Sequence, residues 1–367
     1  MTLVRQVYFA ERAPESVGLW AKINSTTVFS RCIQVYSHTA ALSGLAPRPV
    51  ATPRHLDGQS AATGLLRLDG VPVLKTPTER RLRFFAWLSL ALQLLIVLTG
   101  GAVRLTASGL GCPTWPECVD GSFVTTPEMG IHGVIEFGNR LLFFVIQIVA
   151  IVTLVVVLRL RSGRRDLFVL ALIPCFSIVL QAVLGGITVL TNLNPYVVGL
   201  HFLVSVVLVV IATVFVYRLY YGPRADAVVV PRWFLLLTYA TSAFVVLAIL
   251  LGIITTGSGP HAGDGGAARN GLNSELLQHF HSWPAYAAFA STLLLVVGAF
   301  RVGTPLLKRF TVLLLTIEVA QIAVGLTQAR LGLPEPLVAA HMVLACVLAA
   351  AMAAAVLSLR GTASASR

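Results

Sequence analysis

Long apolar runs separated by short polar segments dominate the chain from about residue 80 onward. A helix needs about 20 apolar residues to cross the hydrocarbon core of a bilayer, and each run is long enough. The runs predict eight transmembrane helices, at approximately 84–103, 131–158, 167–190, 197–217, 233–255, 277–300, 310–329 and 337–358. We therefore expect an all-α integral membrane protein.

Basic residues gather beside alternate ends of these runs. The clusters are Arg80, Arg81 and Arg83; Arg159, Arg161, Arg164 and Arg165; Arg218, Arg224 and Arg232; Arg301, Lys308 and Arg309; and Arg360 and Arg367. Cytoplasmic loops of membrane proteins carry such an excess of Lys and Arg, so both termini are expected in the cytoplasm.

Composition agrees with a membrane protein. The chain of 367 residues is 56% hydrophobic and 11% charged, with a mean hydropathy of +0.84, which excludes an ordinary soluble domain. Its net charge of +12 is explained by the loop clusters, so the expected partner is the lipid bilayer and not a nucleic acid. Residues 1–80 are rich in Pro, Ser, Thr, Ala and Gly without sustained periodicity and predict a disordered cytoplasmic tail.

The second half of the membrane region repeats features of the first. The segments 181–201 and 321–341 both run 20 positions from Gln to His, and "TASG" at 106–109 matches "TGSG" at 256–259. Four crossings return the chain to the same side, so the repeats are parallel. We expect two four-helix bundles, at 81–220 and at 221–367.

The repeat aligns four polar positions near the outer ends of the even-numbered helices. His201 corresponds to His341, and Asn139 takes the place that His281 has in the second half. Imidazoles on facing helices of a bundle can ligate haem iron, so the second half is expected to hold a bis-histidine haem. Membrane histidines can also line a proton path, bond a carbonyl or bind zinc, although no third or fourth zinc ligand is evident.

A polar stripe marks the start of the second predicted helix. His132, Glu136, Asn139 and Arg140 are spaced i, i+4, i+7 and i+8 and share one helix face. Glu136 and Arg140 can form an ion pair that fixes helix packing. Alternatively, they serve chemistry beside a haem in the first half, because a carboxylate is costly to bury in a bilayer without a function.

Three further features leave alternatives open. Cys112 and Cys118 lie in "GLGCPTWPECVDG" on an outer loop, where they predict a disulfide or a redox-active thiol pair. Glu318, in the middle of the seventh helix, is expected to make an interhelical hydrogen bond, with proton transfer as the other interpretation. The Gly-rich loop 255–264 either covers a haem edge or only turns the chain.

Several motifs together resemble the haem A synthase family, over about 84–358. They are "LTGGAVRLTASGLGCPTWPEC", "IEFGNR", "LQAVLGGITVLTNLNP", "GLHF", "TGSGPHAGD" and "AAHMVLA". The resemblance implies an oxidoreductase that converts a methyl group of haem O to a formyl group, giving haem A for terminal oxidases. It also implies two four-helix halves, with a retained haem b in the C-terminal half and the substrate haem in the N-terminal half.

Carried over by motif, the haem b ligands fall on His281 and His341, and a substrate-haem ligand falls on His201. The cysteine pair of the family falls on Cys112 and Cys118.

The family motif E-x-x-H-R in the second helix places Glu136 and Arg140 in the site, and Asn139 stands where the family has a histidine. The resemblance thus implies that Glu136 accepts a proton or stabilises a cation near the reacting methyl group, with Arg140 in support. We expect His201 alone to hold the substrate haem, with the other axial position weak or open beside Asn139. His132 is the alternative substrate-haem contact.

The implied location is the plasma membrane, with multiple crossings and with the haem sites toward the outer face. Implied partners are haem O, the farnesyltransferase that produces it, an electron-transfer protein and a second copy of the chain. The alternative function is a non-catalytic b-type cytochrome that transfers electrons; a transporter built from parallel repeats is a weaker one.

Overall fold

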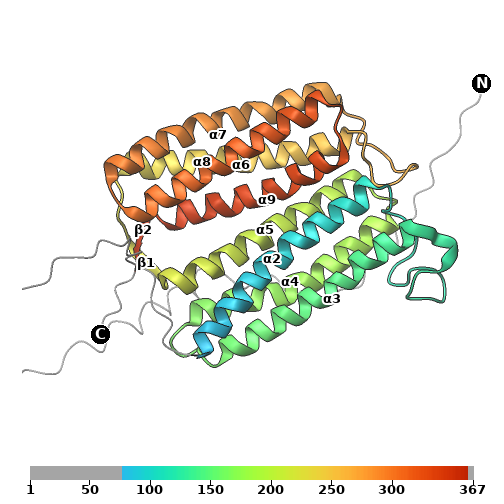
Figure 1. The fold of residues 1–367 in the computed structure, drawn as a ribbon, viewed down its shortest axis with the longest axis horizontal. Helices are drawn as coiled ribbons and strands as arrows, with labels where there is room; N and C mark the ends of the chain where they lie inside the picture. Colours follow the sequence, from blue (N-terminus) through green and yellow to red (C-terminus); the bar gives the residue numbers. More distant parts are fainter. Residues whose placement is uncertain (1–76, 363–367) are drawn as a thin grey trace, which may run out of the picture. The chain divides into compact units, whose positions relative to one another are not determined.

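The computed structural model describes residues 77–362, which are almost entirely helical (Figure 1). The helices are α2 (Pro77–Leu105), η1 (Pro127–Met129), α3 (Gly130–Leu158), α4 (Arg165–Leu190), α5 (Pro195–Tyr221), α6 (Arg232–Ser258), α7 (Ser274–Val302), α8 (Pro305–Arg330) and α9 (Glu335–Leu357). Eight of them carry an apolar stretch long enough to cross a membrane, which confirms the eight predicted spans. The predicted tail lies outside the described residues, except that α2 begins at Pro77 and not near residue 84.

Polar and special residues define where several helices begin and end. The Asn194 side chain accepts a hydrogen bond from the Tyr196 backbone N–H at 3.0 Å at the start of α5. Asn273 caps α7 in the same way through Leu276 at 2.9 Å. Gly303 ends α7 with a φ of 91°, a left-handed conformation that favours glycine.

Helices α2–α5 pack together, and helices α6–α9 pack together in the same pattern. Helices α2 and α4 each contact both α3 and α5, and α6 and α8 each contact both α7 and α9. Helices α3 and α5 therefore occupy opposite corners of their group, as do α7 and α9. The two groups meet where α9 lies against α2 and α5, and α5 against α6 (Figure 1).

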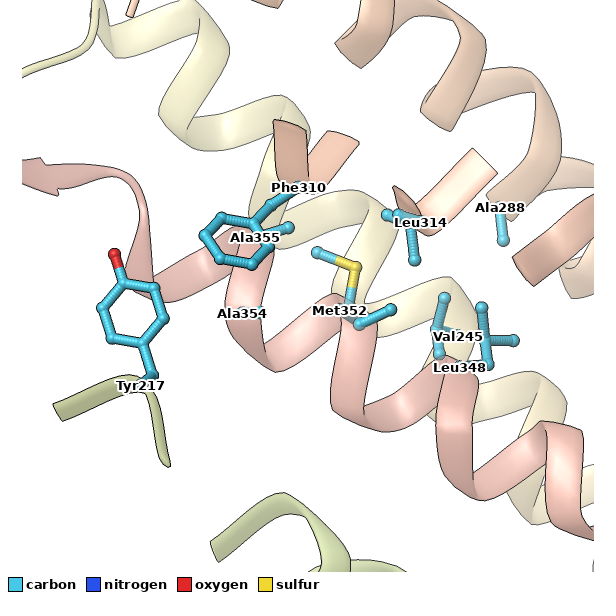
Figure 2. Close-up of a cluster of buried hydrophobic side chains, with 10 residues drawn as sticks. Tyr217, Val245, Ala288, Phe310, Leu314, Leu348, Met352, Ala354 and Ala355 are labelled. Atoms are coloured by element: carbon cyan, nitrogen blue, oxygen red, sulfur yellow. The ribbon is translucent and has the colours of Figure 1, made fainter. Parts of the chain in front are cut away.

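A buried apolar cluster joins the two groups at one end (Figure 2). Tyr217 of α5 lies against Phe310 of α8, with ring centroids 5.6 Å apart. Met352 and Ala355 of α9 belong to the same cluster and are almost fully buried. Small residues on α9 allow this close approach of helices from both groups.

A short antiparallel pair of strands was not predicted from the sequence. Strand β1 (Arg224–Val228) follows α5, and β2 (Arg360–Thr362) follows α9, with Val228 opposite Arg360. Because α5 packs against α9, the segments that leave both helices emerge side by side and can pair. Apart from these strands, the described fold is helical, as expected.

The loops after α4 and α8 have the same backbone geometry. Leu193 and Leu333 have φ values of 59° and 63°. The Leu193 N–H donates to the Thr188 carbonyl at 2.7 Å, and the Leu333 N–H donates to the Gln328 carbonyl at 2.8 Å. The two leucines occupy equivalent positions in the repeat predicted from the sequence.

Candidate functional site

His281 of α7 and His341 of α9 face each other inside the second helix group. Their ring centroids lie 6.2 Å apart, and the ring planes make an angle of 82°. His281 Nδ1 lies 2.8 Å from the Ala248 carbonyl oxygen of α6. Since a carbonyl oxygen can only accept, Nδ1 carries the hydrogen and Nε2 is left with a free lone pair.

Glycines make room for both imidazoles. A Cβ atom on Gly252 would lie 2.9 Å from Cε1 of His281, and one on Gly325 would lie 2.9 Å from Cε1 of His341. Real Cβ contacts are almost never so short, so a side chain at either glycine would displace the imidazole from its position. Gln321 of α8 adds a polar contact, because its Nε2 donates to the His341 carbonyl at 3.2 Å and lies 3.3 Å from His341 Nε2.

The first helix group repeats much of this arrangement around His201 of α5. Gln181 Nε2 donates to the His201 carbonyl at 3.0 Å and to Ser205 Oγ at 2.6 Å. A Cβ atom on Gly185 would lie 3.5 Å from Cε1 of His201, an ordinary contact. The Nδ1 atom of His201 is buried and has no hydrogen-bond partner within 77–362.

Asn139 lies on α3, at the corner opposite α5. Its Oδ1 is 2.8 Å from Thr99 Oγ1 of α2, so the amide is held toward α2 by a hydroxyl that sequence analysis did not single out. The second group has the carbonyl of Ala248 on α6 as the partner of His281 at the equivalent corner. The two helix groups thus have similar arrangements but differ in the side chain at this corner, which is Asn139 in the first group and His281 in the second.

Glu136 is nearly fully buried, with 5% of its surface exposed, and both of its carboxylate oxygens are engaged. Its Oε1 forms an ion pair with Arg140 Nη2 at 2.6 Å, which confirms the predicted pairing. Its Oε2 accepts a hydrogen bond from the Cys112 backbone N–H at 2.7 Å. The carboxylate therefore connects α3 to the loop between α2 and η1 that carries the cysteines.

Arg140 extends this connection. Its guanidinium donates to the carbonyl oxygens of Cys112 at 2.9 Å, Thr114 at 3.1 Å and Glu117 at 3.2 Å. All three of its nitrogen atoms are engaged by these carbonyls and by Glu136. The Glu136–Arg140 ion pair thus holds the backbone of the 112–118 loop in place through hydrogen bonds.

Cys112 and Cys118 form a disulfide, as predicted. Both are fully buried, and the bond closes the loop whose backbone contacts Glu136 and Arg140. His132 does not take part in these contacts. It is exposed near the start of α3, and its Nδ1 is 2.9 Å from Ser108 Oγ.

The Gly-rich loop after α6 links several elements. Arg104 of α2 donates to the carbonyl oxygens of His261 at 2.7 Å and Thr256 at 3.0 Å. His261 Nε2 in turn lies 3.0 Å from the Leu333 carbonyl, and the Gly109 N–H donates to the Gly263 carbonyl at 2.8 Å. The loop therefore fastens the two helix groups together at the end where the histidines lie.

Eight helices long and apolar enough to cross a membrane define a multi-pass membrane protein, and His281 and His341 face each other in its second helix group. A family model described as cytochrome oxidase assembly protein, COX15-CtaA, matches residues 83–353. The chain belongs to this family, that of the haem A synthases.

Curated relatives agree with the family. A protein named Heme A synthase from Lysinibacillus sphaericus is 35% identical over 133 residues, which cover 35% of this chain and 42% of the relative. One from Symbiobacterium thermophilum is 33% identical over 147 residues, covering 40% and 47%. One from Listeria welshimeri is 28% identical over 130 residues, covering 35% and 42%. The chain thus matches less than half the length of each of these relatives.

Proposed function

We propose that this protein is a haem A synthase, an oxidoreductase that converts a methyl group of haem O to a formyl group. The observation that carries the proposal is the facing pair of His281 and His341 in a chain of this family. Family membership and the relatives' name, Heme A synthase, supply the substrate class.

The residues of the second helix group fit a haem iron. Iron bound to one nitrogen of each imidazole at about 2 Å would separate the ring centres by roughly 6 Å, as found for His281 and His341. The carbonyl of Ala248 orients His281 as a second-layer partner does for a metal-bound imidazole. We infer that this pair holds a retained haem b, which would supply one-electron chemistry when bound.

The first helix group is the proposed site of the substrate haem O. His201 would be its axial ligand, and its unpartnered Nδ1 is consistent with an imidazole whose environment is completed by a cofactor. Asn139, held by Thr99, is a poor iron ligand compared with histidine, so a haem held by His201 would have no strong second protein ligand and would be available for oxidative chemistry. His132 is the alternative contact for the substrate haem.

Glu136 is the proposed catalytic group, with Arg140 as its support. Three residues separate Glu136 from Asn139 on α3, so the two lie about one helical turn apart. The Cys112 N–H and Arg140 hold the buried carboxylate in place, where its negative charge would act strongly on nearby positive charge. Its role would be to accept a proton or stabilise positive charge as the methyl group is oxidised.

We also propose the arrangement in the membrane. Matching loops at Leu193 and Leu333 and matching glutamine contacts at Gln181 and Gln321 support parallel repeats, with bundles at 81–220 and 221–367. The positive-inside pattern favours cytoplasmic termini, with a plasma-membrane location and sites toward the outer face. Proposed partners are the farnesyltransferase that supplies haem O, an electron-transfer protein and a second copy of the chain.

The test is expression of the full chain in cells that make haem O but no haem A, followed by purification and extraction of haem. Haem A in the extract, identified by chromatography and by its pyridine haemochrome spectrum, is the expected result. Recovery of haem O unchanged would identify a non-catalytic b-type cytochrome. A purified protein without Soret absorption would favour a transporter, although α4 and α7 continue through Pro174 and Pro284 without the matched breaks of such proteins.

A further inference from the structure

Glu318 is a buried carboxyl group that the proposed oxidation of haem O does not use. It lies in the middle of α8, and only 3% of its surface is exposed. Its Oε1 accepts a hydrogen bond from Thr292 Oγ1 of α7 at 3.0 Å, which confirms the predicted interhelical bond. Its Oε2 is buried and has no hydrogen-bond partner among the described residues.

A second orphaned acceptor lies one turn away. The Oε1 atom of Gln321 is also buried and has no partner in the described part of the chain. Side chains at i and i+3 on a helix are neighbours. A proton on Glu318 Oε2 would turn one of these two acceptors into a donor for the other, so a single proton can satisfy both buried atoms.

The same glutamine contacts one histidine of the facing pair, His341. Gln321 Nε2 lies 3.3 Å from His341 Nε2, and one helical turn separates Gln321 from Glu318, so the carboxyl and the imidazole are roughly 10 Å apart. Leu314 lies one helical turn before Glu318 on α8, away from Gln321, and Figure 2 shows it in the apolar cluster with Ala288, Val245 and Leu348. The polar route to the carboxyl therefore leads from the histidine side.

The first helix group has no acid at the position equivalent to Glu318. The repeat places Ile178 at the position of Glu318 and Ala150 at that of Thr292, and both are buried in an apolar cluster. A structural polar contact that both halves needed would be present in both. The carboxyl is instead confined to the half that contains the facing histidines.

We propose that Glu318 is a redox-linked proton-binding site of the second helix group. The inference rests on the proposed haem between His281 and His341. When a one-electron donor reduces the iron, the positive charge that stabilised the carboxylate is lost, and Oε2 binds a proton from solvent. Reoxidation removes the electron and releases the proton. Charges roughly 10 Å apart, at an effective dielectric constant of about 20, change a proton affinity about tenfold.

Other titratable groups on the helices that pack around α8 do not supply this charge. They are His279, His281, Tyr286, Glu275 and Arg301 on α7; Glu335, His341 and Cys346 on α9; and Lys308, Arg309 and Arg330 on α8 itself. The two facing histidines are the proposed ligands, and Cys346 is buried among residues of the other helix group. The remaining groups lie at helix ends or, like Tyr286 with 55% exposure, on the outer surface.

The test is potentiometric titration of the bound haem in the purified full chain over a range of pH, with redox mediators. In the wild type the midpoint potential should fall with rising pH by about 59 mV in total, which corresponds to a tenfold change in proton affinity for a one-electron couple. Glu318→Gln should give a potential that is constant over the same range. Ser291→Ala, which removes a neighbouring buried hydroxyl bonded only within its own helix, should retain the wild-type dependence.

A pH dependence that persists unchanged in Glu318→Gln overturns the proposal. If that variant does not fold, redox-difference infrared spectra of the wild type with labelled glutamate decide instead. A protonated-carboxyl band that grows on reduction is expected, and its absence contradicts the proposal. These readouts need only bound haem, so a protein that binds haem without making haem A would refute the proposed function and leave this inference standing.

Discussion

The backbone N–H of Cys112 donates a hydrogen bond to Oε2 of Glu136 at 2.7 Å. This bond joins the proposed catalytic carboxylate to the loop closed by the Cys112–Cys118 disulfide. Because both oxygens of this buried carboxylate are hydrogen-bonded or ion-paired, Glu136 can hold the loop in place and can also act in the chemistry. Experiments on Glu136 must therefore separate loss of charge from loss of the loop.

Glu136→Gln should fold and retain haem b but produce haem A at a rate lower by on the order of 100-fold. Glutamine keeps the size of the side chain and can still accept from the Cys112 N–H, but it lacks the charge. Glu136→Ala removes the ion-pair partner of Arg140, whose guanidinium keeps only its contacts to backbone carbonyls, so its yield of folded protein should be lower. Haem A formed per unit of folded protein is the measurement; a wild-type rate in Glu136→Gln would show that the charge has no catalytic role.

Replacing both Cys112 and Cys118 with serine should lower haem A production while the haem b content stays as in the wild type. The loop they close contacts Glu136 and Arg140, in the first helix group, whereas the facing histidines lie in the second. Loss of a disulfide costs about 2 kcal/mol or more of stability. Thermal stability, haem content and activity check the prediction, and loss of haem b would contradict the separation of the two sites.

His281→Ala and His341→Ala should each lose most of the tightly held haem b. Iron that has two imidazole ligands would be left with one, and the affinity of the site would fall. His279→Ala is the matched control, because this exposed histidine lies on the same helix two residues from His281. Haem content of the purified variants is the measurement, and equal content in all of them would refute the ligand assignment.

Gly325→Ala and Gly252→Ala should also weaken haem b binding, although neither residue would touch iron. A new Cβ atom would lie 2.9 Å from the ring of His341 or His281 and would displace the imidazole. Gly138→Ala is the control, since a Cβ atom there meets nothing within 4 Å. Normal haem content in the first two variants would show that the imidazoles are free to move.

Asn139→His should close the open axial position proposed for the substrate haem. In the wild type, reduced protein loaded with haem O should bind carbon monoxide at the iron held by His201, with a shift of the Soret band. A histidine at position 139 would compete for that position and abolish the shift. Thr99→Val, which removes the bond to Asn139 without adding a ligand, should still bind carbon monoxide. A wild type that does not bind it would indicate a six-coordinate iron.

Properties that depend on the order of residues along one helix could be predicted from the sequence. The apolar runs gave the eight membrane helices because bilayer thickness sets their length, and the i, i+4 spacing gave the Glu136–Arg140 pair. The short loop between Cys112 and Cys118 made their disulfide predictable in the same way. In each case the partners are near in sequence, so the local geometry fixes their contact.

Only the tertiary structure shows contacts between residues that are far apart in the chain. Thr99 meets Asn139, the Ala248 carbonyl meets His281, and Arg104 reaches the loop after α6, all across helices. Every residue has a backbone carbonyl, so the sequence does not indicate which one accepts a side-chain hydrogen bond. A threonine in an apolar helix can equally donate to a carbonyl of the preceding turn. The facing of His281 and His341 likewise depends on α7 and α9 taking opposite corners of their bundle, which is decided by the packing of all four helices and not by the pattern of any one of them.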